Sequence, residues 1–283
     1  MKTKYKLTAL LMALTGFFVR AEIYNVEVGQ FEKLKVNGNF NVVYKNLPDS
    51  TGFARFEAPQ GNEGLFVIKT KGDGNLRVEP NDDKWGNRDL PVLYLYSDFL
   101  SVLESYSDQT VEVENLAPCA TFSVTQVGNG RININNVKCN NLTASISTGN
   151  GTIYISGKCI NANFRMVGAG LISADQLQAE NVKCRILGTG SIGCWPIDNL
   201  SVTGLGTTKI YYKGKPNVKK TGGGKLFELP DDIEDDELSK TGVELKSIRA
   251  VPVEVTPEDS TSDEDDDYDE EDEEYQTVVT ADD

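Results

Sequence analysis

The chain has 283 residues and a formal net charge of −15, with 28 Lys and Arg against 43 Asp and Glu, and it contains no histidine. This length allows one large domain or two small ones. Without histidine, Ser-His-Asp and Cys-His catalytic arrangements are excluded, and the commonest general base and metal ligand are missing.

The first 21 residues resemble a secretory signal peptide. A basic start with Lys2, Lys4 and Lys6 precedes the apolar run Leu7–Phe18, which is too short to span a bilayer comfortably. The tripeptide Val19-Arg20-Ala21 fits the small-x-small rule for cleavage. An uncleaved anchor is the alternative interpretation.

Cleavage after Ala21 predicts a mature chain that starts at Glu22. No cysteine ends the apolar run, so a lipoprotein anchor is not indicated, and no later segment is apolar enough to cross a membrane. We therefore expect an exported protein of the periplasm or the cell surface that does not span the membrane.

Residues 22–115 are rich in expected strands. Segments such as FEKLKVNGNFNVVYKN, NLRVEP, PVLYLYS and TVEVENL alternate apolar and polar residues, and clusters of Gly, Asn, Asp and Pro separate them. We interpret them as wide, irregular opening turns that cap a solenoid. A separate small β-sandwich is the alternative.

Residues 116–225 repeat with a period near twenty. The motif Gly-x-Gly recurs at intervals of 21, 19, 20 and 16 residues, at Gly128/Gly130, Gly149/Gly151, Gly168/Gly170, Gly188/Gly190 and Gly204/Gly206. A constant period of this length is the signature of a solenoid. The glycine pairs are expected to form its tight structural corners.

Apolar residues occupy constant positions around these glycines. Two residues past the second glycine stand Ile132, Ile153, Ile172, Ile192 and Thr208, and alternating apolar residues precede each pair. A period of two predicts strands with one buried face. Short strands, tight turns and a period of twenty together predict an all-β fold, a parallel β-helix with equivalent residues in columns.

Asparagine and cysteine also recur every twenty residues. Asn141, Asn161 and Asn181, followed by Asn199, predict corners that tolerate a left-handed backbone and amides that bond along a ladder. Asn141 also begins a formal glycosylation sequon, the less favoured interpretation.

Three of the five cysteines, Cys119, Cys139 and Cys159, would lie one above another, close enough for a disulfide. We favour reduced, packed thiols for all five, because cysteine is also a small buried residue.

Residues 226–283 form an expected linker and an acidic, disordered tail. Glu258–Asp283 contains 15 acidic residues and no Lys or Arg, so the remaining 28 acidic residues balance the 28 basic ones. Such a tail cannot bury enough apolar surface to fold. It lacks a spaced calcium loop, so any Ca²⁺ binding is expected to be weak, and the neutral body without a basic stripe argues against nucleic acid.

Three stretches carry a resemblance to a known family. The opening VEVGQFEKLKVNGNFNVVYK, the serial Gly-x-Gly corners and the closing KIYYKGKPNVKKTGGG are similar to the autotransporter adhesin head domain, or GIN domain. The similarity covers about residues 26–224. It implies a right-handed β-helical fold in an exported bacterial protein and no known enzymatic activity, and the acidic tail lies outside it.

Enzymatic activity is not expected. Polysaccharide cleavage needs convergent carboxylates, and Asp175, Glu180 and Asp198 occupy different positions in their turns. The stretch Gly188–Gly193 has the G-x-G-x-x-G spacing, but strand patterns flank it where dinucleotide binding needs a helix and a later acidic residue. No catalytic, cofactor-binding or metal-ligating residue is predicted, and no cofactor.

Arg165 and Arg185, twenty residues apart, are the candidate ligand contacts. They are expected to stack outward and could bind an anionic glycan, although two solvated surface arginines are the commoner situation. We expect a non-enzymatic, adhesin-like module that presents its β-helical face to a glycan or an envelope protein. The alternative is an envelope-maintenance protein in which the solenoid is a spacer and the acidic tail docks a partner.

Overall fold

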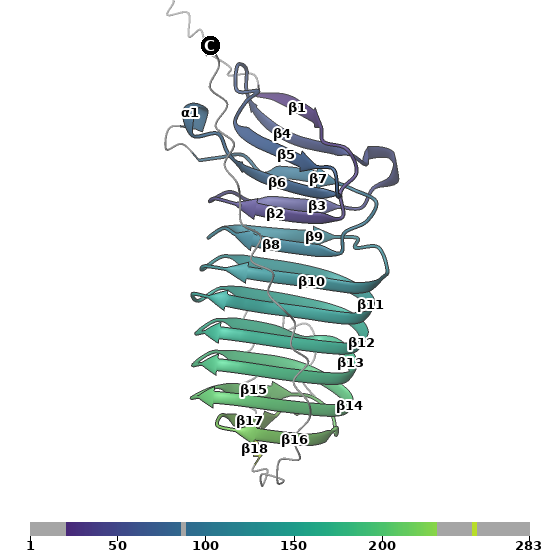
Figure 1. The fold of residues 1–283 in the computed structure, drawn as a ribbon, viewed down its shortest axis with the longest axis vertical. Coiled ribbons are helices and arrows are strands. Elements are labelled where there is room, and N and C mark those ends of the chain that lie inside the picture. The colour runs from purple at the N-terminus through teal and green to yellow at the C-terminus, as the bar shows by residue number, and fades with distance from the viewer. Residues whose placement is uncertain (1–20, 86–88, 231–250, 254–283) are drawn as a thin grey trace, which may run out of the picture.

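The computed structural model describes residues 21–85, 89–230 and 251–253. They form a nearly all-β parallel solenoid with about six turns, drawn with its long axis vertical in Figure 1. The predicted all-β parallel β-helix is therefore confirmed. The predicted signal peptide before Ala21 and the acidic segment Glu258–Asp283 lie outside the described residues.

The regular turns are made of long strands that bend around the core. These strands are β10 (Cys119–Val127), β11 (Arg131–Thr148), β12 (Thr152–Gly168), β13 (Leu171–Gly188) and β14 (Ser191–Gly206). Each pairs in parallel with the next, mostly with an offset of 18 to 21 residues. Equivalent residues therefore lie one above another, about 4.8 Å apart.

The opening turns stack in an order that differs from the chain order. The pair β2 (Lys33–Asn37) and β3 (Val42–Lys45) lies between two later pairs. On one side are β6 (Asn75–Pro80) and β7 (Leu93–Tyr96), and on the other are β8 (Val102–Tyr106) and β9 (Thr110–Glu114). An early segment is thus inserted between two turns that form later in the chain.

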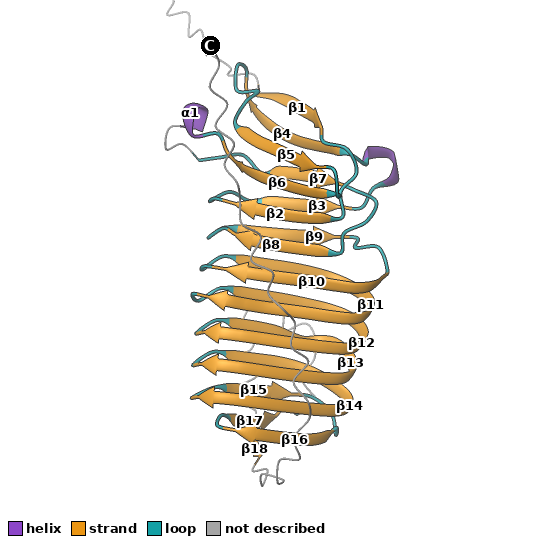
Figure 2. Ribbon diagram, in the orientation of Figure 1, coloured by secondary structure: helices purple, strands orange, loops and turns teal. Residues whose placement is uncertain are grey.

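Antiparallel strands close the N-terminal end. β1 (Ala21–Glu27) pairs with β4 (Phe53–Pro59), which pairs with β7, and β5 (Phe66–Lys71) pairs with β6. A 3-10 helix (Pro48–Ser50) and the single turn α1 (Asp82–Trp85) lie beside them, as Figure 2 shows.

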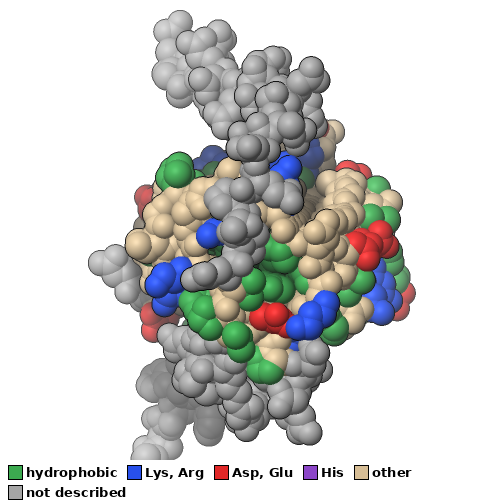
Figure 3. Space-filling view, turned by 90° about the horizontal axis from the view of Figure 1, so that it is seen from below, with side chains coloured by type: hydrophobic (Ala, Val, Ile, Leu, Met, Phe, Trp, Pro, Cys, Tyr) green, Lys and Arg blue, Asp and Glu red, His purple; other side chains and the backbone are tan. Residues whose placement is uncertain are grey.

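Four short strands complete the C-terminal end. β15 (Lys209–Tyr212) and β16 (Asn217–Gly222) pair with β14, β17 (Lys225–Glu228) pairs with β15, and β18 (Val251–Val253) adds to β17 in antiparallel orientation. Figure 3 views the molecule from this end, where hydrophobic side chains lie among charged and other side chains.

One continuous core runs along the solenoid. The apolar residues that the alternation placed inside are buried in every regular turn, for example Phe122, Leu142, Phe164, Val182 and Leu200. Burying one such side chain contributes roughly 1.5–3 kcal/mol, so stacked turns supply a core that a single turn could not. None of the helices among the described residues is long and apolar enough to cross a membrane.

Candidate functional site

The candidate site lies on one long outer surface, which we call face A. Face A is the outward side of β5, β6, β2, β8, β10, the second halves of β11 to β14, and β16, which pair in this order. Alternate residues of these strands point into the core, so the remaining residues point outward in columns. The columns repeat the same chemistry from turn to turn.

The first column is a ladder of asparagine amides. Asn161 Nδ2 donates to Asn141 Oδ1 at 2.9 Å, Asn181 Nδ2 to Asn161 Oδ1 at 3.1 Å, and Asn199 Nδ2 to Asn181 Oδ1 at 2.8 Å. A groove of about 410 Å³ runs along it, lined also by the next outward column, which contains Thr143, Asn163, Lys183 and Ser201. The ladder orients a row of amide groups toward a ligand in this groove.

The backbone of the ladder differs from the left-handed corners that the sequence predicted. Asn141, Asn161 and Asn181 lie within strands, and the positive φ angles among described non-glycine residues are at Asn115 and Asn136. The parallel ladder requires extended backbone here, because these residues pair in register with the turn above. Amide bonding, and not turn geometry, therefore accounts for the repeated asparagines.

Arg165 and Arg185 lie in the third outward column of face A. They are directly in register in neighbouring strands, and both are exposed. The next column, Val167, Leu187 and Leu205, is an exposed apolar ladder with exposed fractions of 48%, 52% and 63%. The structure thus places the two candidate arginines between polar and apolar columns.

The glycine corners border this apolar ladder. Gly128, Gly149, Gly168, Gly188 and Gly206 have positive φ. At Gly188 the φ angle is +138°, and a Cβ would overlap the carbonyl oxygen of Gly168 in the preceding turn. Their partners Gly130, Gly151, Gly170 and Gly190 are buried. No dinucleotide cradle forms, since Ser191–Gly206 is a strand and not a helix.

The fifth corner has a register that the spacing did not predict. Gly206 pairs with Gly188, whereas Gly204 pairs with Ile186. The buried Thr208 takes the place of the second glycine, because Ser191 pairs with Lys209. Gly204 therefore lies two residues before the corner, in register with Ile186, and not in the column of first glycines.

The cysteine column lies two residues before the asparagine ladder, with Cys139 and Cys159 buried and Cys119 partly exposed. Cys119, Cys139 and Cys159 are in register, and all five cysteines are free thiols. Burial, together with the neighbouring Cys139, raises the pKa of the Cys119 thiol to about 11. Hydrogen bonding to Cys184 and complete burial raise the pKa of Cys194 well above its ordinary value.

The acidic residues considered for catalysis do not converge. Asp175 is buried on β13, where its Oδ1 accepts a hydrogen bond from Ser173 Oγ at 2.7 Å, whereas Glu180 and Asp198 are exposed. Within residues 21–85, 89–230 and 251–253, no three His, Cys, Asp or Glu side chains are grouped as metal ligands.

The structure adds a cationic cluster that the sequence reasoning missed. It lies at the N-terminal end of face A around a groove of about 310 Å³. We call this cluster the cationic cradle, and it consists of Lys33, Lys35, Lys69, Lys71 and Arg77. Its signal in the sequence is the alternation of basic residues in KLK and KTK, but only tertiary pairing brings the segments together.

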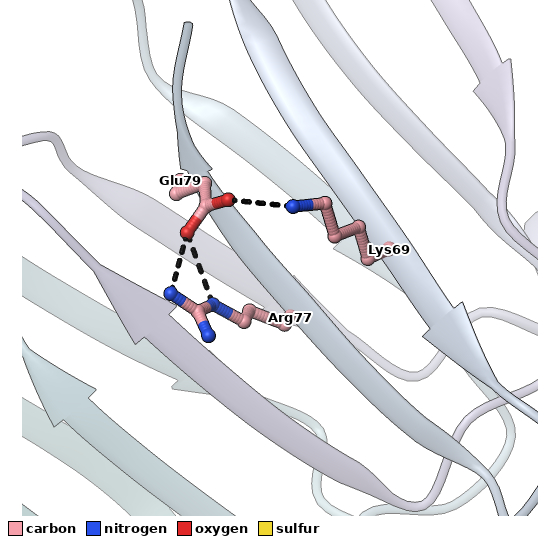
Figure 4. Close-up of polar contacts among 3 residues, drawn as sticks. All are labelled: Lys69, Arg77 and Glu79. Atoms are coloured by element: carbon pink, nitrogen blue, oxygen red, sulfur yellow. Dashed lines mark hydrogen bonds and ion pairs between the residues drawn. The ribbon is translucent and has the colours of Figure 1, made fainter. Parts of the chain in front are cut away.

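Two carboxylates hold part of the cradle in place. Glu79 accepts from Lys69 at 3.2 Å and from Arg77 Nη2 at 2.8 Å (Figure 4), and Glu104 lies 3.3 Å from Lys35 Nζ. Although burial opposes the shift, the hydrogen bonds and charges of Lys69 and Arg77 lower the pKa of Glu79. Burial likewise opposes the shift at Lys35, but Glu104 raises its pKa. Both ion pairs therefore stay charged near neutral pH.

The fold and its outer columns define a parallel β-solenoid with a repetitive, solvent-exposed face. The chain matches the family described as "Putative auto-transporter adhesin, head GIN domain" over residues 30–216, and it belongs to this family. This confirms the resemblance found in the sequence.

Solved structures share the fold. One, described as a putative adhesin from Bacteroides fragilis, has 22% identity and a TM-score of 0.66, covering 74% of this chain and 97% of its own. A putative adhesin from Parabacteroides merdae has 19% identity, a TM-score of 0.59, and coverages of 75% and 97%. A putative lipid binding protein from Parabacteroides distasonis has 18% identity, a TM-score of 0.57, and coverages of 74% and 97%. Comparison with curated proteins gives no match.

Proposed function

We propose that this protein is an exported, non-enzymatic binding module that presents face A to a glycan of the cell envelope or cell surface. The observation that carries this proposal is the asparagine ladder, whose amides are joined by bonds of 2.8–3.1 Å over four turns. Amides donate and accept, as sugar hydroxyls do. A polymer of hydroxyl-rich units can therefore bind along the solenoid with repeated contacts.

The shape of the surface supports a long ligand. The groove beside the ladder is open and runs across four strands. The apolar ladder of Val167, Leu187 and Leu205 offers exposed apolar surface beside the two arginines. Sugar rings have both polar edges and apolar faces, so alternating polar and apolar columns match their chemistry. Membership of an adhesin-like family is consistent with a binding role.

A glycan array probed with the chain from Glu22 to Asp283 tests this function. The informative variant replaces Arg165 and Arg185 by Gln. Its matched control replaces Lys138 and Lys158 by Gln, because these are also exposed cations in register, twenty residues apart, on another surface. We expect the arginine variant alone to weaken binding to the glycans that the parent chain retains.

Two results would contradict the proposal. Equal binding by both variants would show that Arg165 and Arg185 do not contact the glycan. A blank array with every glycan class would favour the alternative, in which the solenoid is a spacer. A further chain ending at Pro257 then tests the acidic tail, because loss of a protein partner on this deletion would assign docking to Glu258–Asp283.

A further inference from the structure

We propose that the cationic cradle is a binding site for an acidic glycan, one that carries carboxylate groups on its sugar rings. This inference rests on the proposed function and specifies its ligand class. The cradle and the asparagine ladder both belong to face A, several strands apart. A polymer that runs along face A would meet both.

The cations form a regular grid. Lys71, Asn75 and Lys33 lie in register on three neighbouring strands, and Lys69, Arg77 and Lys35 form the next row. Neighbouring strands are about 4.8 Å apart, and alternate residues of a strand are about 7 Å apart. Five positive charges therefore share a small area on one surface, which favours a ligand with repeated negative charges.

The internal ion pairs do not neutralise this grid. Among the residues that the structure describes, Glu104 is the only acidic one that lines the groove, and Glu79 lies beside it. Glu32 and Asp73 lie near the turn at Gly74, where Asp73 accepts from Asn75. Lys33 has no ion pair within the described part of the chain, and its side chain is exposed. The pairs instead hold Arg77 and Lys35 in fixed positions, which lowers the entropic cost of binding.

Arg77 is oriented for a planar anion. Glu79 holds it from one side. With the amide oxygen of Asn37 turned toward it, Asn37 accepts from the Arg77 Nε and Nη2 atoms at 2.9 Å. A guanidinium fixed in this way presents its remaining donors in one direction, and a carboxylate is the group that matches this fork.

An aromatic ring next to the cradle favours a sugar over an acidic peptide. Tyr106 follows Glu104 on the outward side of β8, is 41% exposed, and pairs in register with Asn37. Lys35 Nζ lies 4.5 Å from the centre of its ring. The apolar face of a sugar can pack on this ring while its carboxylate reaches Lys35 or Arg77. Asn75 lies between Lys71 and Lys33 in the first row and lines the groove, where its amide is available for hydroxyl contacts.

The test compares two forms of one polymer. The chain from Glu22 to Asp283 is titrated with polygalacturonate, which has a carboxylate on every ring, and with its methyl ester, which has the same backbone without charge. We expect binding to the acid form at least tenfold tighter than to the ester. This difference is expected to shrink as NaCl rises from 50 to 500 mM, because salt screens exposed charges.

Two variants locate the binding. We expect K33Q/K71Q to weaken binding of the acid polymer at least tenfold, and Tyr106→Ser to weaken it without altering the salt dependence. The control K209Q/K225Q removes two exposed cations that are also in register, on β15 and β17 away from face A, and should bind like the parent. An unchanged thermal midpoint for each variant excludes unfolding as the cause.

The outcomes separate the two proposals. Equal affinity for acid and ester, or no effect of K33Q/K71Q, overturns the cradle as an acid site, while neutral glycan binding lost in R165Q/R185Q leaves the proposed function intact. If a peptide of sequence Glu258–Asp283 binds the cradle and the polymer does not, the cradle is a site for acidic polypeptide and the glycan inference is wrong. If no glycan binds at all, both proposals fail.

Discussion

Asn161 donates its amide proton to Asn141 across neighbouring turns at 2.9 Å, and it accepts one from Asn181 at 3.1 Å. A central rung of this ladder therefore makes two bonds between side chains, whereas the terminal Asn199 donates one. Each such bond contributes about 0.5–1.5 kcal/mol net. The ladder thus ties successive turns together from outside the core.

We expect Asn161→Ala to destabilise the protein by about 1–2 kcal/mol, and Asn199→Ala by about half as much, because the first removes two bonds and the second one. Chemical denaturation followed by circular dichroism measures both changes. Equal losses at the two positions would show that the ladder bonds are not the source of the effect.

A substitution at Gly188 tests whether the close approach of successive turns requires glycine. Gly188→Ala forces a Cβ into the carbonyl of Gly168 and keeps a φ of +138°. Gly61 provides the control, since its φ is +85° but a Cβ there would meet nothing within 4 Å. We expect Gly61→Ala to lose about 1–2 kcal/mol from backbone strain alone, and Gly188→Ala to lose at least twice as much, measured as unfolding free energies. Similar losses would exclude the steric contact.

The Cys119 thiol is expected to react slowly with alkylating reagents in the folded protein. The thiolate is the reactive form, and burial raises the pKa of Cys119 to about 11. At pH 8 only a small fraction of this thiol is therefore ionised, and its alkylation rate by iodoacetamide should rise about tenfold per pH unit until pH approaches 11. In urea all five thiols should label at pH 8. Rapid native labelling of Cys119 at pH 8, or a mass increase of the intact chain on reduction, would contradict this prediction.

Replacing one arginine of the pair Arg165 and Arg185 is expected to stabilise the protein. Arg165 and Arg185 face one another in register, and like charges so placed are destabilising. We expect Arg185→Thr to stabilise the fold by about 0.2–1 kcal/mol at low salt and by less at high salt. Lys183→Thr is the control, because Lys183 pairs with Asn163 and Ser201 and not with a cation. Thermal melts at two salt concentrations measure the difference, and a loss of stability in Arg185→Thr would be evidence against repulsion.

Substitutions in the core column and in the surface column of one strand are expected to change the unfolding free energy by very different amounts. Phe164 is 1% exposed and Val167 is 48% exposed, both on β12. We expect Phe164→Ala to cost about 3–5 kcal/mol of unfolding free energy, and Val167→Ala to change it little. If Val167→Ala were as costly, its column would be packed against something and not available to a ligand.

Much of the regular solenoid could be predicted from local pattern. The alternation around Phe122, Leu142 and Phe164 identified the buried face, and the twenty-residue interval identified the neighbours of Asn161 and Cys139. These predictions hold because each regular turn contacts the next turn along the chain, so a sequence interval translates directly into a spatial neighbour.

The candidate site could be predicted only in part. Arg165 and Arg185 follow the interval and were found, whereas the cationic cradle joins Lys33 to Lys71 and Arg77 across irregular turns. Residues 22–115 have no constant interval, so nothing in the sequence relates β2 to β6. At the fifth corner the interval itself changes, and Gly206 rather than Gly204 pairs with Gly188.

The sequence by itself determined the all-β class, the parallel stacking, the columns of equivalent residues in the regular turns, and the family. These features depend on periodicity along the chain. Only the tertiary structure decided that β2 and β3 lie between β6/β7 and β8/β9, and hence that five cations meet on face A. The physical reason is that each strand could pair with any of several strands distant in the sequence, because all of them have a similar alternation of apolar and polar residues. Packing of the shared core selects the order, and a period of two residues contains no information about it.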